Sequence, residues 1–356
     1  PHSPCPMPHS LHSMNNIYSW FSQDYAQAQE RFQKATHLLE CGAIEVSDGL
    51  TIDWAWSGNS QSRHVLVFSS GLHGVEGFAG SAAQLYLLSL NPEISTLWLH
   101  VLNPWGMANL RRVDRENIDL NRNFLADPKE YQGLHPTYSL LDALLNPPSP
   151  PTRDFFLLQL IQAVLQYGYE NVKTAVVTGQ YEYPQGLFFG GKSLQPELSR
   201  LLLFLDETLS HRERIVHVDL HSGLGKFGDR SLLLEGESNP EQVARAQRAF
   251  GSQLKSRYRR QGGYLVRGGF TRALAQRLQG VRYDGITCEF GTHNMLHVLA
   301  ALRNENREHH YGQRDLFAPA KQQLLEVFSP SDLTWRNQVL LHAITVYKQA
   351  CVMLND

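Results

Sequence analysis

Hydrophobic positions along this chain fall into two alternating kinds of segment. Short runs rich in β-branched and other apolar residues predict strands at 64–70, 97–103, 173–179, 214–222, 231–237 and 285–291. Longer stretches with apolar residues at helical spacing predict helices at 77–90, 153–172, 196–210, 241–260, 293–311 and 332–353. This alternation, with strands that are apolar throughout, predicts an α/β fold: a three-layer α/β/α arrangement with a mixed, mostly parallel central sheet.

A proline-rich segment at 127–151 interrupts the alternation. It predicts a long irregular excursion, of the kind that is either disordered or borders a site. Because the following helix resumes the same alternation, we interpret 15–356 as a single domain. Residues 1–14, rich in Pro, His and Ser, predict a flexible tail whose prolines disfavour a folded metal site.

Composition narrows the possible partners. The 32 Lys and Arg residues against 34 Asp and Glu give a net charge of −2, which offers no basic surface for nucleic acid. No apolar stretch approaches the roughly 18 residues that a membrane-spanning helix needs. The N-terminal segment lacks the basic and apolar regions of a secretory signal. Four widely spaced cysteines fit a reducing compartment, so we expect a cytoplasmic protein: Cys5, Cys41, Cys288 and Cys351.

The first candidate for chemistry is the segment SSGLHGVEGF (69–78), which follows a predicted strand. Open α/β sheets bind ligands at the carboxyl ends of their strands, where His73 and Glu76 would lie. Imidazole and carboxylate both suit zinc. The interleaved glycines would let the backbone aim both side chains at one point. Taken alone, a His and a Glu at this spacing are a weak signal.

The second candidate is HVDLHSG (217–223), at the end of another predicted strand. Strand alternation sends His217, Asp219 and His221 to one face. His221 lies at the strand's end and is the plausible third ligand. We interpret His217, deeper in the strand, as a hydrogen-bonded core histidine. Asp219 would either orient a ligand or be a buried hydrogen-bonding residue.

The third candidate is NPWGMANLRRVDRENIDLNRNF (103–124), a loop crowded with arginines and asparagines. Its apolar residues indicate a structured loop and not a merely solvated one. An arginine side chain can bind a carboxylate through two parallel hydrogen bonds, and it can stabilise an oxyanion. Arg111, Arg112, Arg115 and Arg122 are all available for these roles.

The fourth candidate is Glu289, within the apolar segment GITCEFG (285–291). A carboxylate on a buried strand is costly unless it is paired or functional. Beside an activated water it would act as a general base. Alone, it could equally be a core glutamate paired with an arginine.

Other motifs fail. Residues 223–228 fit GxGxxG, but a strand-like segment follows where a dinucleotide site needs a helix. GxSxG, the motif of serine α/β-hydrolases, does not occur, and neither does HExxH. We interpret the basic run at 255–267 as a solvated helix end, although basic runs with tyrosines also occur in nucleic-acid binders.

A zinc hydrolase needs three protein ligands, a base and an oxyanion stabiliser, and the chain offers all of them at predicted strand ends. HGVE, DLNRNF, DLHSG and EFG occur in an order that resembles the zinc carboxypeptidase (funnelin) superfamily. That superfamily includes acylases such as aspartoacylase and succinylglutamate desuccinylase. The match looks closest to an uncharacterised bacterial branch of these metallopeptidases and spans about 70–292.

The resemblance implies a zinc carboxypeptidase-like fold and one zinc ion, held by His73, Glu76 and His221. It also implies that Asp119 holds the other ring nitrogen of His73. The carboxylates Asp119, Asp219 and Glu116 leave a second metal open.

For the substrate, the resemblance implies that Asn121 and Arg122 grip a terminal carboxylate. Arg112 would polarise the scissile carbonyl, a role that Arg115 contests. Glu289 would take a proton from the activated water and return it to the leaving amine. Tyr264 and Tyr283 are only candidates for the tyrosine that closes over substrate in digestive carboxypeptidases, and His293 lies outside the family pattern.

The expected reaction is therefore hydrolysis of an amide next to a free carboxylate. A carboxypeptidase acting on small peptides is the first hypothesis. An acylase acting on an N-acyl amino acid is the second. The third is a metal-holding relative without turnover, which would need neither Glu289 nor an oxyanion arginine. The sequence leaves the exact substrate and the oligomeric state open.

Overall fold

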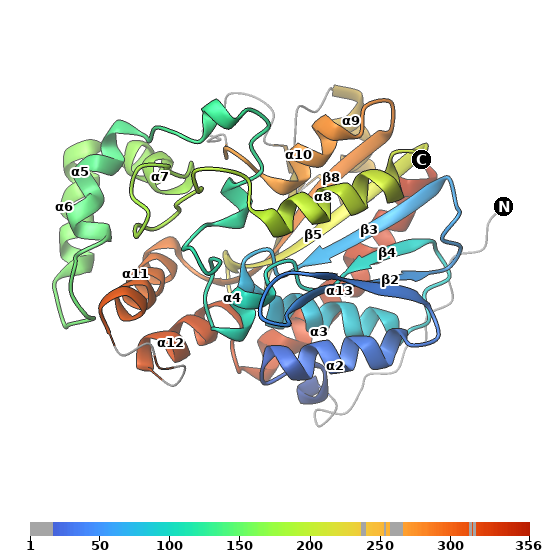
Figure 1. Cartoon of the computed structure of the whole chain (residues 1–356), viewed down its shortest axis with the longest axis horizontal. Coiled ribbons are helices and arrows are strands. Elements are labelled where there is room, and N and C mark those ends of the chain that lie inside the picture. The colour runs from blue at the N-terminus through green and yellow to red at the C-terminus, as the bar shows by residue number, and fades with distance from the viewer. Residues whose placement is uncertain (1–16, 236–239, 253, 257–265, 313–314, 316–317) are drawn as a thin grey trace.

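Eight strands form one mixed sheet within residues 17–235, 240–252, 254–256, 266–312, 315 and 318–356, which are the residues that this computed structural model describes (Figure 1). Their order across the sheet is β1-β2-β4-β3-β5-β8-β6-β7. The strands are β1 (Glu40–Glu45), β2 (Thr51–Ser57), β3 (His64–Ser70), β4 (Thr96–Leu99), β5 (Arg214–Leu224), β6 (Arg230–Leu234), β7 (Lys255–Ser256) and β8 (Arg282–His293).

The four central strands, β4, β3, β5 and β8, are parallel, and they are flanked by β2 and β6 in antiparallel pairing. In this register Ser69 lies beside Asp219, and His221 lies beside Glu289. The carboxyl ends of β3, β5 and β8 therefore meet at one edge of the sheet, the place where open α/β sheets bind ligands.

Helices cover both faces of the sheet and complete three layers, which confirms the predicted fold class. Leu66 and Phe68 of β3 pack with α3 (Gly77–Leu88) and α13 (Leu333–Asn355), whereas Val65 and Val67 pack with α8 (Pro196–Leu209) and α10 (Phe270–Arg277) on the opposite face. The helices are α2 (Tyr25–Thr36), α3 (Gly77–Leu88), α4 (Pro104–Ala108), α5 (Pro136–Leu145), α6 (Phe156–Tyr167), α7 (Tyr169–Val177), α8 (Pro196–Leu209), α9 (Pro240–Phe250), α10 (Phe270–Arg277), α11 (Met295–Tyr311), α12 (Pro319–Phe328) and α13 (Leu333–Asn355), with 3₁₀ turns η1 (Tyr18–Trp20), η2 (Gly74–Glu76), η3 (Leu120–Arg122) and η4 (Pro128–Glu130).

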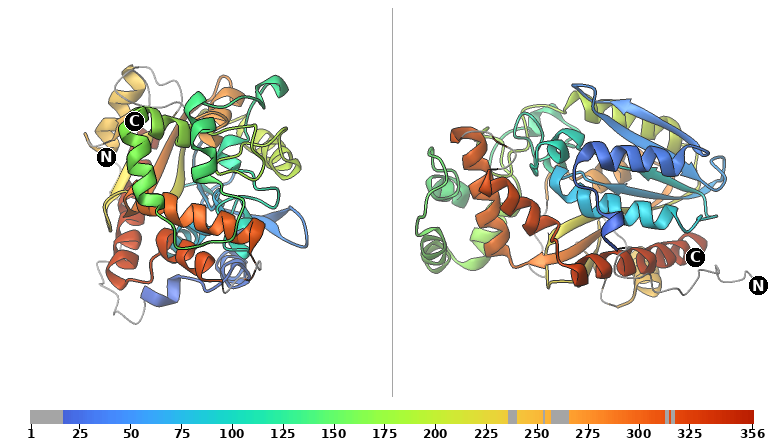
Figure 2. Two further views of the ribbon diagram at one scale, coloured as in Figure 1. Left: turned by 90° about the vertical axis from the view of Figure 1, so that its left-hand side faces the viewer. Right: turned by 90° about the horizontal axis from the view of Figure 1, so that it is seen from below.

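A further group of helices lies beyond the carboxyl ends of the central strands (Figures 1 and 2). Helices α5, α6, α7, α11 and α12 share a hydrophobic core, which also includes residues of α2, α3 and α4 and to which α7 contributes Val176 and α11 contributes Leu302. This helical group forms a wall facing the strand ends where the site lies.

Residues 173–177 belong to helix α7, so the prediction of a strand at 173–179 was wrong. Val172, Ala175 and Val176 are buried at helical spacing in α7 and pack into the helical group. Their β-branched composition resembles that of a strand, but tertiary packing decides the outcome. The helix predicted at 153–172 is divided at Gly168, whose φ of +85° separates α6 from α7.

The prediction of an irregular excursion at 127–151 was also wrong in part, because helix α5 lies within it. Pro136 occupies the first turn, where its missing N–H costs nothing. The His135 side chain caps the helix by accepting the Thr137 N–H at 3.3 Å. Leu141 and Leu145 then bury one face of the helix.

Other boundaries differ as well. The helix predicted at 241–260 ends at Phe250, before Gly251 with its φ of +91°, and residues 255–256 form β7. The interpretation of 255–267 as a helix end was therefore wrong at its start, and residues 257–265 lie outside the described residues. The predicted tail at 1–14 lies outside them too. The hairpin β1–β2 and helices α2, α10 and α12 were not predicted.

The fold bears on the dinucleotide motif at 223–228 and on membrane-spanning helices. Strand β6, and no helix, follows residues 223–228, which agrees with rejecting a dinucleotide site there. Among the described residues, no helix combines the length and apolar character needed to cross a membrane.

Candidate metal centre

His73 and Glu76 lie in the turn that follows β3. Gly71, with a φ of +66°, lets the chain reverse there. Gly74 packs so closely on the Gly106 backbone that a Cβ atom would lie 2.2 Å from it. His73 precedes η2, and Glu76 is its last residue. Both side chains are buried, with exposed fractions of 4% for His73 and 3% for Glu76.

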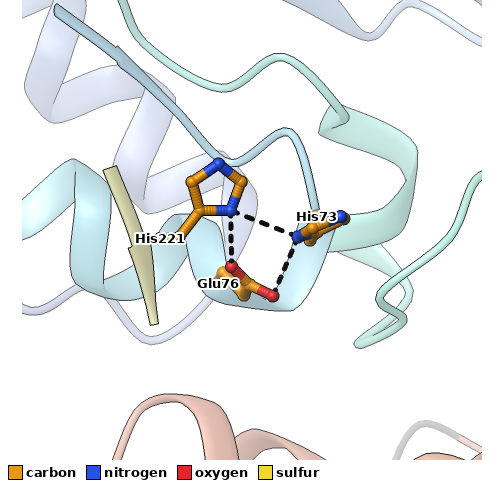
Figure 3. A group of neighbouring side chains, drawn as sticks. All are labelled: His73, Glu76 and His221. Atoms are coloured by element: carbon orange, nitrogen blue, oxygen red, sulfur yellow. Dashed lines mark hydrogen bonds and ion pairs between the residues drawn. The ribbon is translucent and has the colours of Figure 1, made fainter. Parts of the chain in front are cut away.

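His221 reaches the same point from the end of β5 (Figure 3). Its Nδ1 lies 3.3 Å from Nδ1 of His73 and 3.1 Å from Oε2 of Glu76. Nδ1 of His73 lies 3.0 Å from Oε1 of Glu76. Within the described part of the chain, these three residues form the one group of three or more His, Cys, Asp or Glu side chains whose ligand atoms could hold a metal ion.

A carboxylate holds the outer nitrogen of each imidazole. Nε2 of His73 lies 3.0 Å from Oδ1 of Asp119, and Nε2 of His221 lies 2.7 Å from Oδ2 of Asp219. An ionised carboxylate favours a proton on the ring nitrogen that faces it, which leaves Nδ1 with its lone pair. Nδ1 of each imidazole then faces the Glu76 carboxylate, where a bound metal ion would contact all three groups together.

The spacing of the three residues fits zinc. Ligand atoms at one edge of a tetrahedral zinc site are about 3.4 Å apart when the bonds are about 2.0–2.1 Å. The three nearest separations here are 3.0, 3.1 and 3.3 Å. Two imidazoles and one carboxylate also form a donor set typical of catalytic zinc, which keeps a fourth position open.

The charges of the cluster are strongly coupled. Burial opposes ionisation of Glu76, but His73 and His221 outweigh it and hold the pKa of Glu76 below its usual value. Burial likewise opposes charge on His221, but Asp219 and Glu76 raise the pKa of His221 well above 6.5. The cluster therefore attracts positive charge, as a proton or as a metal ion.

Arg112 lies beside the metal-ligand group, whereas Arg115 does not. The Arg112 guanidinium pairs with Asp119, and its Nε lies 3.5 Å from Oε1 of Glu76. It also lies over the Phe188 ring, 5.4 Å from the centroid. Arg115 is at the surface, where it pairs with Asp48 and its side chain is 48% exposed. Of the two arginines, only Arg112 lines the pocket.

Asn121 and Arg122 line the same pocket, held by their neighbours. The Asn121 backbone N–H donates to Asp119 Oδ1 at 3.1 Å, and Asn121 Oδ1 accepts from the Phe270 N–H at 3.0 Å. Arg122 donates through Nε and Nη2 to the Val177 carbonyl at 3.1 and 2.7 Å. Part of the Arg122 guanidinium is therefore used to fix its own position.

Glu289 faces the pocket from β8. It pairs in register with His221, so the two side chains come from neighbouring positions on adjacent strands. Arg112 is close enough for its charge to interact with that of Glu289. A carboxylate thus lies in the same pocket as the metal-ligand group.

Several other candidates lie elsewhere. The Tyr283 hydroxyl lies 2.6 Å from Nδ1 of buried His217, away from the pocket, so Tyr283 is not placed to close over a substrate. His217 is fully buried and hydrogen-bonded, as interpreted from the sequence. Tyr264 lies outside the described residues. His293 stacks near His297 at 5.8 Å and does not line the pocket.

The carboxylates considered for a second metal have other partners. Asp119 and Asp219 hold the two histidines, and Glu116 accepts from Gln195 Nε2 at 3.2 Å. The described residues contain no second group of three potential ligands.

Sequence reasoning missed some residues of the site. Phe188 lies beneath Arg112, and Ser69 donates to Asp219 Oδ1 at 2.5 Å. Helix α11 supplies much of the pocket wall, including Val298 and Leu302. These residues carry no motif, because an apolar side chain in a pocket wall looks like any core residue in the sequence.

Comparison with known families places the chain in one of them. A family model described as "Protein of unknown function (DUF2817)" matches residues 21–342, and the chain belongs to this family. No curated protein matches the chain.

The chain also matches solved structures, among them the following three. Murein-tripeptide amidase MpaA from Escherichia coli O157 is 18% identical, with 75% of this chain and 92% of that chain covered and a TM-score of 0.43. Carboxypeptidase A from Helicoverpa armigera is 16% identical, with coverages of 92% and 74% and a TM-score of 0.46. Bovine thrombin-activatable fibrinolysis inhibitor is 14% identical, with coverages of 94% and 98% and a TM-score of 0.44.

Proposed function

We propose that the protein is a zinc-dependent hydrolase that cleaves an amide bond next to a free carboxylate, as a metallocarboxypeptidase-like peptidase. The observation that carries the proposal is the convergence of His73, Glu76 and His221 in a pocket that Glu289 also lines. A site that only stored metal would need no further carboxylate beside it.

The proposed ligands are His73 and His221 through Nδ1, and Glu76 through its carboxylate. When bound, a zinc ion supplies a Lewis acid that lowers the pKa of water to about 7. Asp119 and Asp219 keep the imidazoles oriented and their Nε2 atoms protonated. Burial preserves this arrangement by excluding competing water.

The remaining residues act on the substrate. Glu289 accepts a proton from the attacking water and delivers it to the leaving amine. Arg112 donates N–H groups to the carbonyl oxygen as negative charge develops there. Asn121 and Arg122 hold the free carboxylate and so fix which amide lies beside Glu289. We place these residues in one catalytic domain at 15–356 of a cytoplasmic protein.

An acylase that acts on a small N-acyl amino acid is the alternative. The pocket volume of about 100 Å³ suits one small residue, which an acyl amino acid supplies as well as the last residue of a peptide does. Both reactions use the same residues. They differ only in the acyl part of the substrate, which is a peptide for the carboxypeptidase and a small acyl group for the acylase.

Hydrolysis by metal-free and zinc-restored protein tests the proposal. Peptides of varied C-terminal residue and a panel of N-acyl amino acids are supplied to both forms. We expect zinc-dependent release of single C-terminal residues. Turnover of acyl amino acids alone would select the acylase, and tight zinc binding with no turnover of any amide would refute a hydrolase.

A further inference from the structure

The part of the pocket that faces the metal-ligand group from the helical side is apolar. Helix α11 contributes Val298, Leu299 and Leu302, and α7 contributes Val176 and Val177. These five side chains are at most 8% exposed and belong to the hydrophobic core of the helical group. Their neighbours fix the wall and leave it little freedom to rearrange.

Every charged residue of the described pocket lining already has a proposed role in metal binding, catalysis or substrate binding. The charged lining residues are His73, Glu76, Arg112, Arg122 and Glu289. Besides Asn121, the other polar one is Ser222, whose hydroxyl donates to the Phe328 carbonyl at 2.6 Å. A charged substrate side chain against this wall would lose its hydration without gaining a partner.

We propose that the substrate residue carrying the free carboxylate has an uncharged, hydrophobic side chain, which packs against α7 and α11. This inference rests on the proposed function and adds the substrate class to it. The volume of about 100 Å³ favours a branched aliphatic side chain over an indole.

Four N-blocked dipeptides that differ only in the final residue test the inference with the native protein. Leu, Phe, Lys and Glu occupy that position in turn, and kcat/KM is measured for each. We expect Leu to exceed Lys and Glu by about ten-fold or more, since burying an apolar side chain is worth that much. Equal rates, or a preference for Lys or Glu, would overturn the inference. Failure to hydrolyse any amide would refute the proposed function as well.

A charge placed in the pocket lining beside this wall should change the preference. Met295, a half-buried pocket residue in the first turn of α11, tolerates an acid because a helix N-terminus favours negative charge. Met295→Glu should raise kcat/KM for the Lys substrate relative to Leu by about ten-fold. His297→Glu adds the same charge two positions on, at an exposed residue outside the pocket lining, and should leave the ratio unchanged. The same ratio in both variants would contradict the assigned wall.

A separate observation concerns a buried line of hydrogen bonds behind His221. It runs from Tyr283 through His217 and Ser69 to Asp219, across β8, β5 and β3. The contacts measure 2.6 Å from the Tyr283 hydroxyl to His217 Nδ1, 2.7 Å from His217 Nε2 to Ser69 Oγ, and 2.5 Å from Ser69 Oγ to Asp219 Oδ1.

The donor and the acceptor of each hydrogen bond can be assigned by starting from the Asp219 carboxylate. The Ser69 hydroxyl is the donor in its 2.5 Å contact with Asp219 Oδ1, because a carboxylate oxygen accepts. Ser69 therefore donates to Asp219 and accepts from His217 Nε2–H. Burial lowers the pKa of His217 to about 4, so its imidazole is neutral and Nδ1 accepts from the Tyr283 hydroxyl.

We further infer that Ser69, His217 and Tyr283 are positioning residues for the metal ligand His221. The line fixes one carboxylate oxygen of Asp219 and thereby aims the other at His221 Nε2. Hydrogen-bonded partners of metal ligands typically change metal affinity by about 10- to 100-fold when removed.

Two neighbouring serines supply a matched test. Ser69→Ala removes the hydroxyl from the line. Ser70→Ala removes an equally buried hydroxyl from the next residue of β3, where it donates to the His100 carbonyl. Zinc dissociation constants come from competition with a chromogenic chelator. We expect affinity to weaken about ten-fold in Ser69→Ala, less in Tyr283→Phe, and under about two-fold in Ser70→Ala.

The absorption spectrum of the cobalt-substituted protein gives a readout that general destabilisation would not move. Its visible bands should shift in Ser69→Ala and stay unchanged in Ser70→Ala. Equal affinities and spectra in the two serine variants would overturn the positioning role, while a native protein that binds no zinc would refute the proposed function itself.

Discussion

The Nδ1 atoms of His73 and His221 lie 3.3 Å apart, although 148 positions separate the two residues in the chain. Parallel pairing of β3 with β5 brings their strand ends together. Asp119 and Asp219 then turn both rings so that these nitrogens face Glu76. Two imidazole nitrogens and a carboxylate this close in a buried place attract a positive charge, which is the physical basis of the proposed zinc site.

Replacing Glu76 with glutamine removes the negative charge and keeps the shape of the side chain. We expect zinc affinity to fall by about 100-fold or more, because an amide is a poor zinc ligand. Competition with a chelator measures the change. Glu116→Gln is the control, since that carboxylate contacts Gln195 outside the pocket lining, and it should bind zinc like the native protein. Unchanged affinity in Glu76→Gln would remove Glu76 from the ligand set.

Glu289→Gln should separate catalysis from metal binding. The amide cannot take up a proton, so we expect kcat to fall by about 10²- to 10⁴-fold while zinc content stays at the native value. Steady-state kinetics on the best amide substrate, with elemental analysis of the same sample, measures both. Native activity in this variant would show that another group is the base.

The two arginines that the sequence could not distinguish make a paired test. Arg112→Lys keeps a positive charge near Asp119 but loses the planar fork, and we expect kcat to fall by about 10²-fold or more. Arg115→Lys changes a surface pair with Asp48 and should leave kcat within about two-fold. The reverse ranking would place the oxyanion role on Arg115.

Buried His100 should make the fold sensitive to acid. Burial lowers its pKa to about 3, against 6.5 for the exposed side chain. The unfolded chain therefore binds a proton between these values that the folded chain does not. The free energy of unfolding then falls as the pH decreases from about 6.5 toward 3, by up to about 1.4 kcal/mol per pH unit from this group.

His100→Gln tests that linkage. Glutamine can still reach Ser81, whose hydroxyl lies 2.8 Å from His100 Nε2, but it does not titrate. We expect denaturant unfolding measured from pH 4 to 6.5 to show a shallower pH dependence in the variant. The same slope in both proteins would contradict a depressed pKa for His100.

The sequence predicted the strands that matter most for the site. Strand β3 matches the predicted 64–70, and β5 and β8 contain the predicted segments 214–222 and 285–291. Each is a largely apolar run that carries a polar residue near its carboxyl end. That pattern identifies both a strand buried on two faces and the point where it emerges at a site.

Other features depend on contacts that the sequence does not reveal. Val176 and Val177 look like strand residues, but packing against α5 and α6 makes their segment helical. Arg112 and Arg115 look equivalent until the loop folds and turns one toward Asp119 and the other toward Asp48. Tyr283 could not be excluded as a substrate contact before its hydroxyl was seen to meet His217.

The most direct test is anomalous diffraction at the zinc absorption edge from crystals of the zinc-restored protein. We predict one peak per chain, about 2.0–2.2 Å from Nδ1 of His73, Nδ1 of His221 and the carboxylate of Glu76. A peak elsewhere, a second peak of equal height, or no peak among these three side chains would contradict the account.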